Sequence, residues 1–165
     1  MKEIRLFEAF AGYGSQLMAM RRLEEKYPDE IKVIPVGISE IDKYAIKAYH
    51  AVHGEDIKNY GDISKIDWSE VPDFDLLTYS FPCQDISNAG NQRGFEENSE
   101  TRSSLLWECR KAIIAKKPKY LLMENVAALV GQKFIKTFNA WQAELESYGY
   151  TNFTQILNAK DYGVP

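Results

Sequence analysis

The chain has few of the residues from which disulfide frameworks and metal centres are built. Only two cysteines and two histidines occur among its 165 residues. Cys83 and Cys109 stand in unlike sequence contexts, so they do not suggest a disulfide. His50 and His53 lie one helical turn apart with no suitable third ligand nearby, so we expect no metal site and interpret both as solvated helix residues. A domain of this length buries roughly 70% of its unfolded surface, so its stability requires neither kind of cross-link.

The sequence also lacks a signal peptide, a long apolar run and an excess of positive charge. No segment is apolar for long enough to span a membrane, which together with the cysteine contexts predicts a reducing, cytoplasmic setting. Lys and Arg number 20 against 24 Asp and Glu, and the net charge is −4. This balance argues against a chain whose whole surface binds nucleic acid non-specifically, although it leaves room for a local basic face.

Short apolar runs alternate with longer amphipathic runs along the whole chain. Strands joined by helices need crossover connections, so we expect an α/β domain with a mainly parallel sheet and helices on both faces. No linker or internal repeat divides residues 1–165 into two domains. The predicted strands cover residues 4–7, 31–38, 57–60, 74–79, 120–123 and 151–157, and the predicted helices cover residues 17–23, 42–53, 101–116, 126–129 and 134–148.

Three of the predicted strand ends suit an adenosine-containing ligand, because such sheets bind ligands at the carboxyl ends of their strands. Gly12 and Gly14 form a turn after the first strand, which is typical of an anion-binding helix start and equally of a plain strand-to-helix turn. Leu17 stands where a dinucleotide fingerprint has its third glycine, which disfavours NAD or FAD. Glu40, after the second strand, can accept both hydroxyls of a ribose. Asp62, after the third, can accept from an adenine amino group or cap a turn.

The next two strand ends carry residues suited to catalysis. Cys83 heads a polar loop over residues 80–100, a length that compact domains rarely have without a functional reason. We interpret Cys83 as a nucleophile whose thiolate amides or a cation would stabilise, and Cys109, inside a predicted helix, as a small buried hydrophobe. Glu124 directly follows a buried apolar run, where it can donate a proton to a substrate or cap the short helix at 126–129.

As an ordered set, these residues resemble the motifs of the cytosine-5 DNA methyltransferases. The resemblance covers the whole chain, and its specific part is Pro-Cys-Gln followed some forty residues later by Glu-Asn-Val. Glu8, Ser15 and Ser80 stand where the family usually has Asp, Gly and Gly, and none of these departures removes a catalytic group. The motifs run in order through Phe10-Ala11-Gly12-Tyr13-Gly14, Glu40, Asp62, Phe81-Pro82-Cys83-Gln84, Glu124-Asn125-Val126 and Asn158-Ala159-Lys160-Asp161-Tyr162-Gly163-Val164-Pro165.

The resemblance implies a Rossmann-like methyltransferase fold and transfer of a methyl group from S-adenosyl-L-methionine to carbon 5 of a cytosine flipped out of double-stranded DNA, with S-adenosyl-L-homocysteine as product. It implies that Cys83 attacks carbon 6 of the ring while Glu124 acts at N3. The residues that it assigns to the cofactor are Phe10, Gly12, Gly14, Glu40, Ile41, Asp62, Ile63 and Pro82. The residues that it assigns to the DNA are Gln84, Ser87, Arg93, Asn125 and Val126.

Related enzymes continue beyond the motif that begins at Tyr162 into a target-recognition region and further motifs. The resemblance therefore implies that residues 1–165 are an incomplete catalytic domain, truncated before that region and inactive alone. Such a chain would work with a missing C-terminal half or a second chain, in a restriction-modification or phage setting within a bacterial or phage-infected cell. An RNA cytosine-5 methyltransferase and a non-catalytic subunit of a split methyltransferase are the alternatives. Neither a membrane nor a metal is an expected partner.

Overall fold

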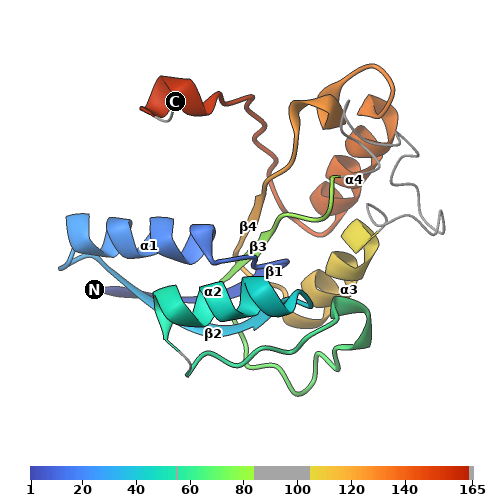
Figure 1. Ribbon diagram of the computed structural model, residues 1–165. Helices are drawn as coiled ribbons and strands as arrows, with labels where there is room; N and C mark the ends of the chain where they lie inside the picture. Colours follow the sequence, from blue (N-terminus) through green and yellow to red (C-terminus); the bar gives the residue numbers. More distant parts are fainter. Residues whose placement is uncertain (55, 84–104, 164–165) are drawn as a thin grey trace.

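The computed structural model describes residues 1–54, 56–83 and 105–163. Its four strands all run parallel, in the order β2-β1-β3-β4, which confirms the predicted α/β class (Figure 1). The elements in chain order are β1 (Lys2–Ala9), α1 (Ser15–Lys26), β2 (Ile31–Ser39), α2 (Lys43–His53), η1 (Ile63–Lys65), β3 (Leu76–Tyr79), α3 (Leu106–Lys116), β4 (Tyr120–Met123), η3 (Ala127–Val130), α4 (Ile135–Ser147) and η4 (Ala159–Tyr162).

Helices cover both faces of the sheet. Alternate side chains of each strand point to opposite sides, so apolar side chains are buried beneath helices on both faces. On one face, Leu6 of β1 packs with Leu17 of α1 and Tyr49 of α2. On the other face, Phe7 of β1 and Leu77 of β3 belong to a larger cluster that includes the buried side chains of α3 and α4. Figure 1 shows the same division, with α1 and α2 on the left and α3 and α4 on the right. The predicted two-sided arrangement of helices is therefore confirmed.

The register of the ladders places the carboxyl ends of the four strands level with one another. Ala9 of β1 is the partner of Ser39 on one side and of Tyr79 on the other, and Tyr79 is in turn the partner of Met123. The residues that directly follow these strand ends therefore lie in one row along a single edge of the sheet. This row is where the sequence predicts the ligand and the chemistry.

The predicted strand at residues 57–60 is wrong, because only one bridge forms there, between Asn59 and Ile38 of β2. The Asn59 side chain explains why the pairing stops. Its Oδ1 accepts from the Glu40 amide at 3.1 Å and its Nδ2 donates to the Glu40 carbonyl at 3.0 Å, so the side chain takes the backbone groups that a longer ladder would need.

The predicted strand at residues 151–157 is also wrong, because this segment joins no sheet within the described part of the chain. Its side-chain pattern is that of a strand, but a strand needs the edge of another strand as a partner. The first residues of this segment bond to α4 instead. Asn152 Nδ2 donates to the Gln142 carbonyl at 2.9 Å, and Gln142 Nε2 donates to Thr154 Oγ1 at 2.9 Å. Phe153, between these two bonded residues, is 92% exposed.

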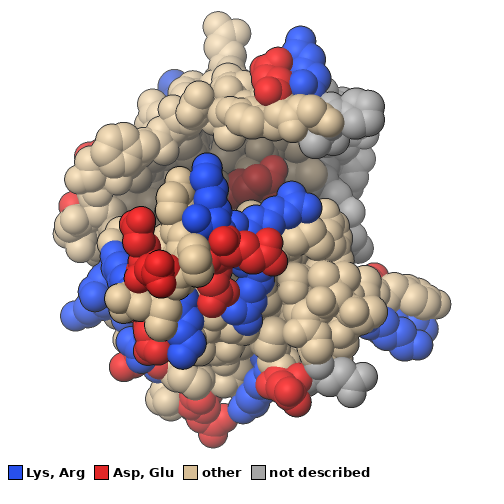
Figure 2. All heavy atoms as spheres, turned by 90° about the vertical axis from the view of Figure 1, so that its left-hand side faces the viewer, with Lys and Arg blue, Asp and Glu red and all other residues tan. Residues whose placement is uncertain are grey.

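The charged side chains on the face shown in Figure 2 are of both signs and are interleaved over its lower half. The upper part of this face is mostly uncharged, and a hollow lies beneath it. This face is therefore no continuous basic surface, as the net charge of −4 leads one to expect.

Candidate functional site

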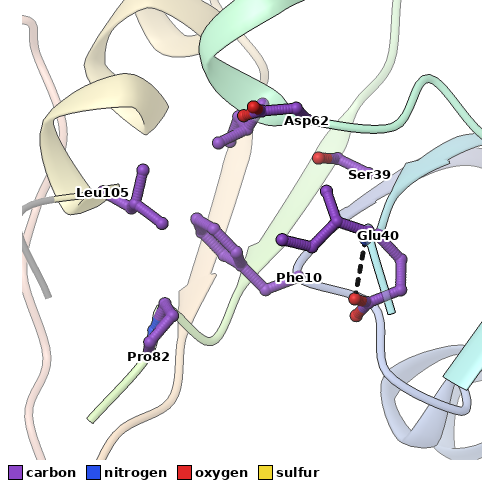
Figure 3. A pocket seen from close by; sticks show the side chains of 8 residues that line it. Phe10, Ser39, Glu40, Asp62, Pro82 and Leu105 are labelled. Atoms are coloured by element: carbon purple, nitrogen blue, oxygen red, sulfur yellow. Dashed lines mark hydrogen bonds between the residues drawn. The ribbon is translucent and has the colours of Figure 1, made fainter. Parts of the chain in front are cut away.

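A pocket of about 140 Å³ lies at the carboxyl ends of the strands, where the side chains shown in Figure 3 converge. Six of the eight residues that the sequence assigns to a cofactor line it, and two others, Ser39 and Leu105, complete its wall. The lining residues are Phe10, Ser39, Glu40, Ile41, Asp62, Ile63, Pro82 and Leu105. The remaining two assigned residues, Gly12 and Gly14, belong to the turn beside the pocket and do not line it.

The turn after β1 has the backbone that its glycines permit. Phe10, Gly12 and Gly14 have positive φ angles of 58°, 57° and 83°. A Cβ atom at Gly14 would collide with the rings of His53 and Tyr49, whereas one at Gly12 would meet nothing within 4 Å. Gly14 is therefore required by both its φ angle and its close packing, and Gly12 by its φ angle alone.

Glu40 connects the turn after β1 to the start of α2. Its Oε2 accepts from the Gly12 amide at 2.9 Å, and its Oε1 accepts from the amides of Ile41 and Asp42, both at 2.8 Å. A carboxylate has about four acceptor positions, so three amides leave roughly one on Oε2 for a ligand. The carboxylate that the sequence assigns to a ribose thus also has a structural role.

Asp62 has the capping role that the sequence left open as an alternative. Its Oδ1 accepts from the Ser64 amide at 3.0 Å and from the Ser64 hydroxyl at 2.8 Å. The hydroxyl bond, and next the amide bond, lower the pKa of Asp62 below its ordinary value. Its Oδ2 lies 3.6 Å from the exposed Lys65 ammonium. Because the side chain also lines the pocket, the cap leaves one oxygen for a ligand donor.

The walls of the pocket are apolar on several sides. Ile63 is 3% exposed and belongs to the main core, whereas Ile41 is 73% exposed and stands at the rim. Sequence reasoning missed Ser39, although it ends β2 and the strand-end rule could have found it; its hydroxyl donates to the Gly61 carbonyl at 2.7 Å. It also missed Leu105, which follows the long loop and carries no sequence signal for a site.

Cys83 and Glu124 follow the two neighbouring strands β3 and β4. Cys83 is half-buried and Glu124 is exposed. Asn125 joins the two segments, because its Nδ2 donates to the Phe81 carbonyl at 3.0 Å and its Oδ1 accepts from the Val126 amide at 2.9 Å. The alternative role of Glu124 as a helix cap is wrong, since Val126 is the residue that flanks η3 and no side chain caps that helix. Gln84, Ser87 and Arg93 lie outside the described residues.

The histidines are not the solvated residues that we predicted. Nε2 of His53 lies 3.0 Å from the Gly14 carbonyl and 3.2 Å from the Tyr13 carbonyl, and its ring lies 4.7 Å from that of Tyr49. His50 is half-buried, and its Nε2 is covered. The prediction failed because Gly14 lets the backbone of the turn approach the last turn of α2 closely. No group of three possible metal ligands occurs among the residues described.

Glu8 is the one acidic side chain of the described residues that the sheet buries. It is 1% exposed, its Oε1 accepts from the Leu17 amide at 3.0 Å, and its Oε2 accepts from the Tyr49 hydroxyl at 2.7 Å. Burial raises the pKa of Glu8 above its ordinary value of 4.5, and the bonds from Tyr49 and Leu17 oppose part of that rise. Sequence reasoning noted this residue only as a departure from a motif.

A sequence model of the C-5 cytosine-specific DNA methylases matches residues 4–165. The chain belongs to this family. It is 42% identical to the type II methyltransferase M2.ScrFI of Lactococcus lactis subsp. cremoris over 98% of this chain and 58% of that protein. It is 39% identical to the orphan methyltransferase M.Rho11sI of Bacillus phage rho11s over 100% of this chain and 31% of that protein. This C-5 methylase chain therefore spans between about a third and three fifths of the length of these relatives.

The methylase fold is seen in a solved relative of low sequence similarity. The crystal structure of the S. pombe Dnmt2 methyltransferase superposes with a TM-score of 0.59 at 20% identity, over 86% of this chain and 39% of that one. At this identity the likeness concerns the fold alone, and it confirms the Rossmann-like methyltransferase architecture. Among the helices of the described residues, none has the length and apolar character needed to cross a membrane.

The two thiols of the methylase chain should react at very different rates. Cys83 is half-buried, whereas Cys109 is 0% exposed and burial raises the pKa of its thiol. A buried thiol reacts only when the structure opens, so we expect Cys83 to react about 100-fold faster with a thiol reagent. Titration with a chromogenic disulfide should count one fast thiol in the native chain, two in denaturant, and none fast in native Cys83→Ser. Equal rates for both thiols would contradict the prediction.

Glu8 should make stability depend on pH in a way that Glu8→Gln removes. Its pKa is raised from 4.5 on folding, so the stabilisation from its bound proton is complete below about pH 4.5 and is lost as pH rises through the folded value. The free energy of unfolding of the wild type, minus that of Glu8→Gln, should therefore fall over this window and then level off. Urea titrations between pH 4 and 8 measure this difference, in which the other carboxylates cancel. A difference that does not vary with pH would refute the assignment.

Proposed function

We propose that residues 1–165 are the cofactor-binding and nucleophile-bearing part of a DNA cytosine-5 methyltransferase that uses S-adenosyl-L-methionine. The observation that carries the proposal is the row of strand ends. The register aligns β2, β1, β3 and β4, so that the pocket, Cys83 and Glu124 follow one edge of the sheet. Family membership gives this arrangement its chemical meaning.

The donors, acceptors and apolar walls of the pocket fit an adenosine-containing cofactor. Glu40 has about one acceptor position left for a ribose hydroxyl, and Oδ2 of Asp62 is an acceptor for an adenine amino group. Ile41, Ile63 and Pro82 offer apolar surface to the adenine ring. When bound, S-adenosyl-L-methionine supplies an electrophilic methyl group on a positively charged sulfur, and S-adenosyl-L-homocysteine is left.

The roles that we propose for Cys83 and Glu124 follow from the weak nucleophilicity of cytosine carbon 5. The Cys83 thiolate would form a bond to carbon 6 while Glu124 hydrogen-bonds or protonates N3, so that carbon 5 becomes enamine-like. After methylation, loss of the carbon 5 proton returns the electron pair to the ring and breaks the sulfur–carbon bond. Both side chains require a cytosine that has left the duplex, because neither could reach these atoms within stacked DNA.

The proposed substrate is double-stranded DNA, contacted by Asn125 and Val126 and by three residues outside the described part of the chain, Gln84, Ser87 and Arg93. The chain spans only part of its relatives, so we propose that it binds the cofactor weakly and methylates DNA only together with the remaining portion of such an enzyme or a second chain. The relatives from a bacterium and a phage support a restriction-modification or phage role in a bacterial cytoplasm.

The pocket assignment is tested by a matched pair of aspartates. Asp62 and Asp67 each accept from the amide and hydroxyl of the serine two residues on, but Asp62 alone of the two lines the pocket. Asparagine retains the capping oxygen and replaces the other oxygen with a donor. We expect Asp62→Asn to weaken binding of S-adenosyl-L-methionine about tenfold, since a hydrogen-bond acceptor for the adenine amino group is lost, and Asp67→Asn to change it less than about twofold.

Equilibrium dialysis with labelled S-adenosyl-L-methionine measures both variants beside the unsubstituted chain. If the unsubstituted chain shows no saturable binding, the proposed function is wrong. If Asp67→Asn weakens binding as much as Asp62→Asn does, the pocket is the wrong place for the adenine.

The nucleophile is tested in a chimaera in which residues 1–165 replace the matched segment of M.Rho11sI. We expect Cys83→Ser to reduce methyl transfer to duplex DNA by roughly 10³-fold or more, as loss of a nucleophile does in other enzymes. Cofactor binding should remain within about twofold, because Cys83 is absent from the pocket wall. Cys109→Ser is the control for loss of a thiol.

A duplex that contains 5-fluorocytosine should form a covalent adduct with the chimaera and none with its Cys83→Ser variant. Transfer retained by Cys83→Ser would remove this residue from the nucleophile role. Turnover on transfer RNA in preference to duplex DNA would favour the RNA methyltransferase, and absence of any adduct would favour a non-catalytic subunit.

A further inference from the structure

The turn after β1 is contacted by Glu40, which precedes α2, and by two residues within α2, Tyr49 and His53. Glu40 accepts from the Gly12 amide in the turn and from the amides of Ile41 and Asp42, the two residues directly before α2. Tyr49 and His53, one helical turn apart, pack against Gly14. The turn is thus held at Gly12 by Glu40, which lines the pocket, and at Gly14 by Tyr49 and His53 of α2.

Tyr49 acts on the turn through the buried Glu8. The Tyr49 side chain is 0% exposed, and its hydroxyl donates to Glu8 Oε2 at 2.7 Å. The other oxygen of Glu8 accepts from the Leu17 amide at 3.0 Å, in the first turn of α1. One carboxylate thereby fixes two helices to the carboxyl end of β1: α1, which follows the turn, and α2, which follows β2. Because the site is nearly dry, removal of one donor leaves a buried acceptor position unpaired.

His53 acts on the turn directly. Its Nε2 lies within hydrogen-bond distance of the carbonyls of Gly14 and Tyr13, at 3.0 and 3.2 Å. Carbonyl oxygens only accept, so this nitrogen is the one that carries the hydrogen. These two bonds orient peptide groups that lie within the turn. A Cβ atom at Gly14 would displace both the His53 and the Tyr49 ring, so the fit is specific to glycine.

We infer that Tyr49 and His53 are positioning residues for cofactor binding, which hold the glycine turn in the conformation that places Phe10 in the pocket wall and the Gly12 amide on Glu40. The inference rests on the proposed function. A turn released from either side chain would populate other conformations, and the measured affinity falls by the fraction of chains in which the turn is correctly placed. Neither residue lines the pocket or belongs to a recognised motif position of the chain.

The test compares Tyr49→Phe and His53→Phe with two controls. Tyr150→Phe removes a comparable hydroxyl bond, the one that Tyr150 donates to the Pro118 carbonyl at 2.6 Å, far from the turn in sequence and fold. His53→Gln keeps an N–H donor at position 53. We expect Tyr49→Phe and His53→Phe to weaken binding of S-adenosyl-L-methionine about five- to tenfold, His53→Gln to recover most of this loss, and Tyr150→Phe to bind like the wild type.

Two measurements distinguish positioning from general destabilisation. Dialysis is run at a temperature at which circular dichroism shows every variant folded, and amide hydrogen exchange is followed without ligand over residues 10–17. Positioning predicts faster exchange in this segment for Tyr49→Phe and His53→Phe and unchanged exchange there for Tyr150→Phe. Affinity losses that follow thermal stability alone, with Tyr150→Phe included, would overturn the inference, as would wild-type binding by Tyr49→Phe. Absence of binding by the unsubstituted chain would contradict the proposed function, and the exchange data would still decide whether α2 holds the turn.

Discussion

Parallel pairing on both sides of β1 is the constraint on which the site depends. Ala9 at the end of β1 is aligned with Ser39 and with Tyr79, so the next residues of three strands emerge side by side. Two parallel strands cannot be joined by a tight hairpin. The chain must therefore leave the sheet at the end of each strand and enter a crossover connection. Single backbone bonds still join neighbouring segments just past these points, from the Ala11 amide to the Ser39 carbonyl and from the Glu124 amide to the Tyr79 carbonyl. The pocket forms at this edge of the sheet, where polar side chains line an open volume.

The acidic residues at this edge serve the fold and remain available to a ligand. Glu40 accepts from three amides and Asp62 caps η1, yet each retains an acceptor position toward the pocket. Such bonds reduce the freedom of the side chains before a ligand arrives, so less rotamer entropy is lost on binding. They also hold negative charge where the adenosine hydroxyl and amino donors of the proposed cofactor would meet it. The cap that Asp62 forms and its proposed contact with a ligand are therefore compatible.

Sequence reasoning predicted the sheet and most of the pocket, because both follow from local patterns. Apolar runs locate β1, β2, β3 and β4, and the strand-end rule then selects Glu40 without any contact information. The same rule selected Asp62 from a strand predicted at residues 57–60, of which one bridge at Asn59 forms. It failed at residues 151–157, since a strand pattern shows only the tendency to pair and not the presence of a partner edge. It failed at His53 for a related reason. The surroundings of that side chain depend on the approach of a backbone segment forty residues earlier in the sequence.

Glu8 stands where the family usually has Asp, and the length of its side chain suits the two long-range contacts that it makes. Glu8 reaches the Leu17 amide with one oxygen and the Tyr49 hydroxyl with the other, although these donors belong to different helices. The aspartate that the motif usually has is shorter by one carbon–carbon bond, about 1.5 Å, and from the same backbone it could not keep both bonds at 3.0 and 2.7 Å. An aspartate here would need β1 and α2 to lie closer together, and Tyr49 already fills that space at 0% exposure. A change of residue 8 must therefore be accompanied by a change in the packing of α2. Helix α2 thus contributes, through Tyr49 and Glu8, to the conformation of the turn.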